Sequence, residues 1–274
     1  MNTKYLIILA IGAIGFSSCQ KEFDPSSYAP PLNIGGYTSA KQIAPSNLVA
    51  HWSFDGNLID SVSKVAGTST GTDFSNGVKG KALQGALNGY VITNTPTAVQ
   101  NLKSFTVSLW QNMPLNDKGI VGLMDIANPN SFWGNLTIFF ENGGNASTGQ
   151  LKMRVNNNGV DNWLGNYAMV NPWDKWNHIT ASYDAASSTY RIYVNGSKIA
   201  TQVIANNGPI TFQNAQKMVF GTVHFQTQPS LTTSTGKQDW ASYLTGQLDE
   251  VRIYDKALSD VEISSLSKLE GRGK

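Results

Sequence analysis

The chain has 274 residues, of which 14% are charged, and its formal net charge at pH 7 is +2. This low and balanced charge includes no basic patch and argues against nucleic acid as a partner. About 230 residues remain after the first 45, which is enough for one large all-β domain with its own hydrophobic core.

Residues 1–18 have the pattern of a bacterial signal peptide. Lys4 gives a positive start, residues 5–14 form an apolar run, and Cys19 is the only cysteine of the chain. The run is shorter than the roughly 20 apolar residues that cross a bilayer. The segment resembles the lipobox of bacterial lipoproteins, which implies cleavage before Cys19 and lipidation of that residue. The alternative is an ordinary signal peptide with a cysteine near its cleavage site.

Residues 19–45 are predicted to form a lipidated tether. They contain several prolines and glycines and few apolar residues, so they bury too little surface to offset the entropy of ordering. Glu22 and Asp24 resemble the acidic surface-export signal of Bacteroidetes lipoproteins. That resemblance implies an outer-membrane anchor at Cys19 and a domain facing the cell exterior, with attachment facing the periplasm as the alternative.

Residues 46–270 contain about a dozen short runs with strand periodicity, separated by turn residues. Residues 48–54 and 105–110 alternate cleanly between two faces, and Asn195 with Gly196 favours a tight hairpin turn. Helical periodicity is almost absent. These features predict a β-sandwich or jelly roll.

The end of the domain carries two local signals. Alternation breaks between Leu248 and Val251, which predicts either a β-bulge or a change of facing residues at Asp249 and Glu250 in the closing strand. Ser259 and Glu262 match the S-x-x-E capping box, which predicts that a short C-terminal helix starts there.

Six motifs follow one another along this region: LVAHWSFDG at 48–56, GVKGKAL at 77–83, FTVSLW at 105–110, WNHITASYD at 176–184, YRIYVNG at 190–196 and LTGQLDEVRIYDKALSDVEI at 244–263. Together they resemble the laminin-G-like, concanavalin-A-like jelly-roll domains of bacterial surface proteins. The resemblance implies two curved antiparallel sheets and a ligand surface on the concave face and its rim loops. It implies no single function, because the fold is used by lectins, glycoside hydrolases, adhesion domains and spacers.

The patterns that hydrolases of this fold use are missing from the sequence. Such enzymes need two positioned carboxylates, and no strand carries an alternating acidic string. Asp249 and Glu250 are adjacent and point to opposite faces in a regular strand, which leaves Asp125 and Glu141 as the pair that could meet. We therefore expect a binding protein rather than an enzyme. A glycosidase with unfamiliar carboxylates is the alternative.

Tryptophans and asparagines are the candidates for sugar binding, because aromatic rings stack on the apolar faces of pyranoses and amides pair with hydroxyls. Trp110 lies on the Thr/Ser face of its strand, and the others lie in or beside polar loops. The predicted set is Trp110, Trp133, Trp163, Trp240, Asn130 and Asn162. The alternative is that each tryptophan covers an end of the sandwich or packs a loop.

A structural calcium ion is the predicted cofactor. Calcium takes oxygen ligands, and the resemblance implies that the first and last strands lie close together. Asp55, Asp60 and Asp249 are the candidate ligands. Alternatively, Asp55 caps a turn and Asp249 is a solvated acid in the bulge.

These observations together predict a monomeric, non-catalytic lipoprotein of the bacterial cell surface that binds a polysaccharide or glycan. The alternative is a structural or adhesive domain whose ligand is a protein. A large exposed apolar patch would favour that alternative.

Overall fold

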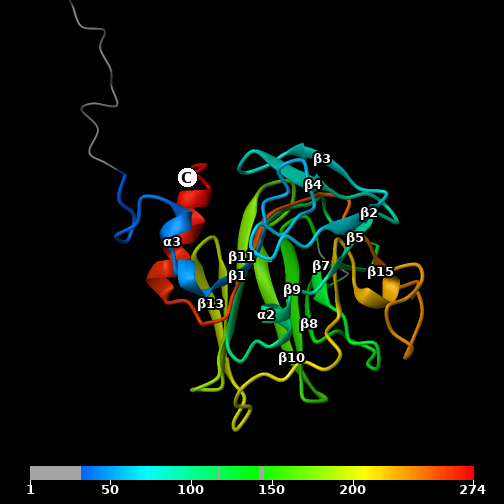
Figure 1. The fold of residues 1–274 in the computed structure, drawn as a ribbon. Helices are drawn as coiled ribbons and strands as arrows, with labels where there is room; N and C mark the ends of the chain where they lie inside the picture. Colours follow the sequence, from blue (N-terminus) through cyan, green and yellow to red (C-terminus); the bar gives the residue numbers. More distant parts are fainter. Residues whose placement is uncertain (1–31, 117, 142–144) are drawn as a thin grey trace, which may run out of the picture. The chain divides into compact units, whose positions relative to one another are not determined.

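The computed structural model describes residues 32–116, 118–141 and 145–274. Two eight-stranded sheets pack face to face in residues 33–274, the compact unit of the chain (Figure 1). Neighbouring strands run antiparallel except for β15 (Ala241–Ser242), which lies parallel to β7 (Ile120–Ile126). The predicted all-β sandwich with a short C-terminal helix is confirmed.

The first sheet has the order β13-β12-β11-β6-β16-β4-β3, with β1 also paired to β16. Its strands are β1 (Leu48–Trp52), β3 (Asp73–Asn76), β4 (Lys81–Gln84), β6 (Phe105–Asn112), β11 (Asn177–Asp184), β12 (Thr189–Val194), β13 (Ser197–Val203) and β16 (Gln247–Tyr254).

The second sheet has the order β10-β9-β8-β7-β14-β5-β2, with β15 beside β7. Its strands are β2 (Gly67–Thr70), β5 (Tyr90–Asn94), β7 (Ile120–Ile126), β8 (Leu136–Phe140), β9 (Thr148–Asn157), β10 (Val160–Val170), β14 (Lys217–Phe220) and β15 (Ala241–Ser242). The helical segments are η2 (Ala40–Gln42), η3 (Pro45–Asn47), α2 (Thr97–Gln100), η4 (His224–Gln226) and α3 (Asp260–Glu270).

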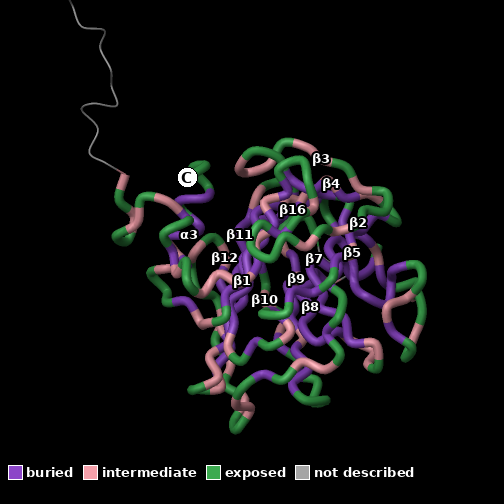
Figure 2. Tube along the Cα trace, viewed as in Figure 1, coloured by how far each residue is buried: buried purple, intermediate pink, exposed green. Residues whose placement is uncertain are grey.

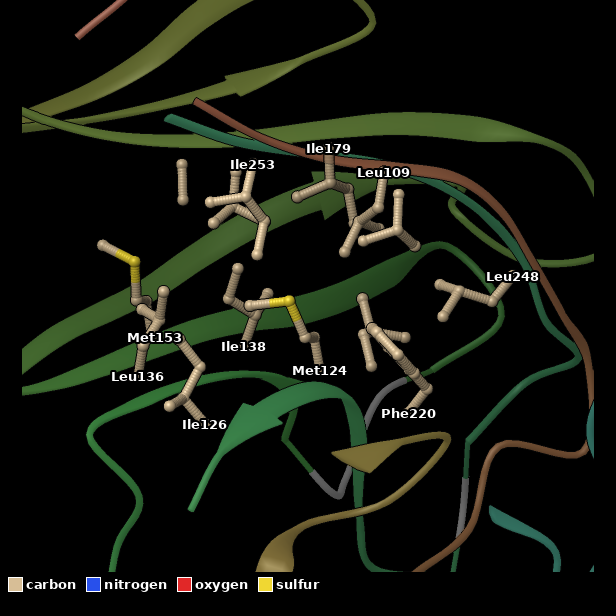
Figure 3. Packing of buried hydrophobic residues seen from close by; sticks show 14 of the residues in the cluster. Leu109, Met124, Ile126, Leu136, Ile138, Met153, Ile179, Phe220, Leu248 and Ile253 are labelled. Carbon is tan, nitrogen blue, oxygen red and sulfur yellow. The ribbon is translucent and has the colours of Figure 1, made fainter. Parts of the chain in front are cut away.

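The core lies between the two sheets. Leu109 and Ile179 of the first sheet face Met124 and Ile138 of the second (Figure 3). The buried stretches follow the strands, whereas the connections are mostly exposed (Figure 2). Each fully buried aliphatic side chain contributes about 1.5–3 kcal/mol to the stability of the fold. Burial of the apolar faces of both sheets therefore drives the sheets together.

The closing strand β16 contains the predicted bulge. Its register with β6 shifts between Asp249 and Arg252, and Glu250 has a φ of 46°. Two residues are thereby accommodated between Leu248 and Val251, so both of these apolar side chains reach the core. The bulge prediction is confirmed.

Helix α3 begins as predicted and packs on the outer face of the first sheet. Ser259 is the N-cap, and it forms a reciprocal capping box with Glu262. The buried apolar side of the helix consists of Ile263, Leu266 and Leu269. The helix therefore covers a sheet face that the strand pattern alone leaves open.

Residues 33–45 belong to the compact unit, whereas the sequence placed them in the tether. They contain η2, which contacts α3, and both Ala40 and Ile43 are buried. The domain thus starts near Asn33 rather than at residue 46. Residues 1–31 lie outside the described residues. They include the predicted signal peptide, Cys19 and the first part of the predicted tether. No helix in the described part of the chain is long and apolar enough to cross a membrane.

Replacing Ile43 with alanine is expected to lower the free energy of unfolding by about 2–4 kcal/mol, because a buried side chain leaves a cavity. Urea denaturation measures the change, and Ile59→Ala, at an exposed position, is the control. If residues 33–45 were only a linker, the two variants would be equally stable.

Candidate functional site

Three of the predicted tryptophans gather on the outer face of the second sheet. The ring centroids of Trp133 and Trp240 are 6.3 Å apart. The guanidinium carbon of Arg154 lies 4.7 Å from the Trp133 centroid and 4.8 Å from the Trp163 centroid. Arg154 therefore connects Trp133 with Trp163. We call these three tryptophans together with Arg154 the tryptophan platform.

Strand alternation places Arg154 and Trp163 away from the core. Met153 and Val155 of β9 face the core, so Arg154 between them points outward. In the β9–β10 pair, Trp163 lies directly opposite Arg154. Side chains of directly opposed residues meet on one face of a sheet, which brings Trp163 to Arg154.

A layer of aromatic rings supports the platform from beneath. Trp133 stacks on Phe139 with centroids 5.2 Å apart, and Trp240 stacks on Phe132 with centroids 6.0 Å apart. Phe225 packs against both tryptophans. Such ring pairs fix the orientation of their members. Trp163 is 47% exposed and Trp240 41% exposed, so both rings stay accessible from solvent.

A buried pair, Asp125 and His224, anchors the loops that carry Trp133 and Trp240. Asp125 Oδ2 accepts a hydrogen bond of 2.8 Å from the His224 backbone N–H and lies 2.9 Å from His224 Nδ1. Thr232 Oγ1 donates to the carbonyl of Ser131 at 2.8 Å. The loop at 128–133 and the segment at 221–243 are thus joined into one hydrogen-bonded unit (Figure 1, beside β15).

Trp110 lies apart from the platform, on the first sheet. It faces away from the core, as its strand pattern predicts, but it is only 7% exposed. Its indole N–H donates to Glu270 Oε2 at 2.8 Å, and its ring packs 5.0 Å from that of His178. Because α3 covers this face, the expectation that Trp110 meets a sugar is corrected.

The two predicted asparagines differ in position. Asn130 is exposed in the loop that carries Trp133, and its backbone N–H donates to Asn128 Oδ1. Asn162 is buried, and its side chain donates to Asn207 Oδ1 at 3.1 Å. Asn162 therefore lines a separate cavity of about 300 Å³ at the 204–207 loop.

Asp125 and Glu141 do not form a carboxylate pair. Asp125 lies opposite Thr137, whereas Glu141 follows Phe140 at the other end of β8. Thr137 and Glu141 are four positions apart in sequence, which along a strand is about 13 Å. Asp125 binds His224, and Glu141 forms an ion pair with Lys152.

The candidate calcium ligands Asp55 and Asp249 hold one turn. β1 and β16 are neighbours, as the resemblance implied. Asp55 accepts the Lys81 backbone N–H at 2.8 Å, and the buried Asp249 accepts the Lys79 N–H at 3.1 Å. A Cβ at Gly80, whose φ is +64°, would lie 2.0 Å from Asp55 Oδ1, so the GVKGKAL motif needs its glycine here.

Asp60 holds a different turn. Its buried carboxylate accepts backbone N–H groups from His51, Val62 and Ser63. Among the residues that the structure describes, no three His, Cys, Asp or Glu side chains are arranged to hold a metal ion. Backbone N–H groups donate to all three predicted acids, and a calcium ion at these residues stays a prediction.

Burial raises the pKa of Asp249 from 3.8 to about 8. The folded state therefore holds a proton that the unfolded state has lost above pH 3.8. The stability this gives is complete at low pH and is lost as the pH rises to about 8, by up to about 1.4 kcal/mol per pH unit. Between pH 6.5 and 8, the free energy of unfolding of Asp249→Asn is expected to fall less steeply with pH than that of the wild type. Urea denaturation in the presence of a chelator measures both. Equal slopes would contradict this pKa.

Repeating the pH series with calcium tests whether the ion binds. Bound calcium would keep Asp249 ionised and would flatten the wild-type slope.

Solved structures with a similar fold include several binding domains. The binding domain of Paraclostridial Mosquitocidal Protein 1 is 18% identical, with a TM-score of 0.61 over 81% of this chain and 52% of that one. A botulinum neurotoxin type C structure, described with the dependence of cell entry on two ganglioside molecules, is 16% identical, with a TM-score of 0.60 over 85% and 53%. This chain spans about half the length of these toxin chains.

A further similar structure is domain 4 of AbnA, a GH43 extracellular arabinanase from Geobacillus stearothermophilus, in complex with arabinotriose. It is 21% identical, with a TM-score of 0.53 over 81% of this chain and 98% of that one. At these identities the likeness concerns the fold. No curated protein sequence matches the chain. The family model described as the concanavalin A-like lectin/glucanases superfamily matches residues 84–264, more than half of the chain, and the chain therefore belongs to this superfamily.

Proposed function

We propose that the protein binds carbohydrate without cleaving it and that the tryptophan platform holds the glycan. The observation that carries the proposal is that Trp163 and Trp240 remain exposed, although β-sheet pairing holds Trp163 and buried hydrogen bonds hold the segment that carries Trp240. Rigid aromatic rings offer a large contact area at a small cost in conformational entropy. Similar folds crystallised with arabinotriose or described with gangliosides support a sugar as the ligand.

The test is affinity electrophoresis of the full chain in gels that contain single polysaccharides, neutral and acidic. At least one polymer is expected to retard the protein, with no release of reducing ends after long incubation. Migration that no polymer changes would overturn the proposal. Release of reducing ends would instead point to the glycosidase alternative.

The proposal also places the protein at the bacterial outer membrane, anchored through a lipid on Cys19 and facing the cell exterior. Its support is the lipobox-like pattern of residues 1–19 and the two acids that follow. Several acyl chains on one residue hold a protein firmly, whereas a single chain gives marginal binding.

Replacing Cys19 with serine is expected to move the protein from the membrane fraction to the soluble fraction and to abolish labelling by radioactive fatty acid. Surface proteolysis of intact cells distinguishes the exterior from the periplasm. A wild-type protein that is already soluble and unlabelled would contradict the anchor and favour an ordinary signal peptide.

A further inference from the structure

The Trp163 end of the platform contains two ion pairs. Lys152 Nζ lies 4.5 Å from the Trp163 ring centroid, close to the contact that Arg154 makes with the same ring. Lys152 is paired with Glu141. Arg154 is paired with Asp161, with its Nε donating to Oδ1 at 3.2 Å and a terminal nitrogen donating to Oδ2. The four charges therefore cancel.

The two signs of charge differ in exposure. The side chains of Lys152 and Arg154 are 8% and 13% exposed, whereas those of Glu141 and Asp161 are each 30% exposed. The cations are recessed against the tryptophan rings, and the carboxylates lie toward solvent. A ligand that approaches Trp163 therefore meets acceptor oxygens before it meets a cation.

Asp161 already compensates the charge of Arg154 and occupies the Nε edge of its guanidinium. A free guanidinium binds a carboxylate through two parallel hydrogen bonds, and here Asp161 already receives such a pair. An acidic sugar would have to displace Asp161 or place its own charge beside it. A sugar hydroxyl, by contrast, can donate to Asp161, because a carboxylate has room for about four donors.

We infer that the glycan bound at the platform is neutral, with a hydroxyl group donating to Asp161, and that acidic polysaccharides are excluded. This inference rests on the proposed function. It adds the ligand's charge, which the tryptophans alone do not determine. Discrimination comes from the repulsion of like charges and from the hydroxyl donor that a neutral sugar keeps.

The test compares one polymer in two forms. A neutral polysaccharide that retards the full chain is used before and after oxidation of its primary hydroxyl groups to carboxylates. At low salt, oxidation is expected to weaken binding about tenfold or more, since a close like charge is then unscreened. Raising the salt concentration is expected to shrink this difference.

Asp161→Asn removes the outward charge and leaves Arg154 uncompensated. This variant is expected to bind the neutral form more weakly and the oxidised form more tightly than the wild type does. Asp73→Asn, at an exposed position on β3 of the other sheet, is expected to keep the wild-type ratio.

Equal or tighter wild-type binding of the oxidised polymer, abolished by Trp163→Ala, would overturn the inference while the proposed function stands. Failure of every polymer in both forms to bind would overturn the proposed function itself. The wild-type comparison requires no variant, so a folding defect in Asp161→Asn does not remove the test.

Discussion

Replacing Glu270 with alanine is expected to lower the free energy of unfolding by about 3–5 kcal/mol, since one partner of a buried ion pair is removed. Glu270 is the last residue of α3 and is fully buried. Its Oε1 accepts from Arg252 Nε at 2.5 Å, and its Oε2 accepts from the Trp110 indole at 2.8 Å. Alanine would leave Arg252 with Glu250 as its remaining ion-pair partner and the Trp110 N–H without its acceptor.

Urea denaturation measures this change, and Lys268→Ala, at an exposed position of the same helix, is the control. Surface substitutions of that kind usually change stability by less than about 0.5 kcal/mol. Glycan binding by folded Glu270→Ala is expected to be unchanged, because the platform lies on the other sheet. A Glu270→Ala protein as stable as Lys268→Ala would contradict the contribution of the Glu270 contacts with Arg252 and Trp110 to stability.

Replacing Trp163 with alanine is expected to weaken glycan binding about 30-fold, the effect of removing a binding hot spot of about 2 kcal/mol. The Trp163 ring is the more exposed of the two accessible platform rings, and two cations lie against it. Alanine removes the stacking surface together with the group that holds Lys152 and Arg154. Affinity electrophoresis at a series of polymer concentrations gives the dissociation constants.

Two further variants separate stacking from folding. Trp163→Phe keeps an aromatic face and is expected to recover part of the affinity. Val203→Ala, at an exposed apolar position at the end of β13, is expected to bind as the wild type does. A Trp163→Ala protein with unchanged affinity would place the glycan elsewhere.

Local sequence patterns were sufficient to predict much of the fold. Strand alternation, the break between Leu248 and Val251 and the Ser259 capping box each depend on residues that are close in sequence. Such signals predict which face a side chain takes and where an element starts. The gathering of Trp133, Trp163 and Trp240 was not predictable in this way, although their position in or beside polar loops marked them as candidates.

The remaining features depend on contacts between residues that are distant in sequence. The pattern of β6 places Trp110 away from the core, but only the packing of α3 decides that protein covers it. Asp249 was expected to be either a calcium ligand or a solvated acid in the bulge, and the turn at 77–81 buries it. Arg154 and Asp161 meet because of the register of β9 and β10, which the composition of neither strand specifies. Ile43 lies in a stretch whose composition resembles a linker, yet α3 offers that stretch a surface.

The most direct test of the tryptophan platform is oxidation of tryptophan in the presence and absence of the glycan that the electrophoresis identifies. Mass spectrometry of peptides reports the oxidation of each ring. In the free protein, Trp163 and Trp240 are expected to react fastest because they are the exposed tryptophans among the described residues. Saturating glycan is expected to protect both rings and to leave the slow oxidation of Trp110 unchanged. A bound glycan that leaves Trp163 and Trp240 equally reactive would contradict the platform as the binding site.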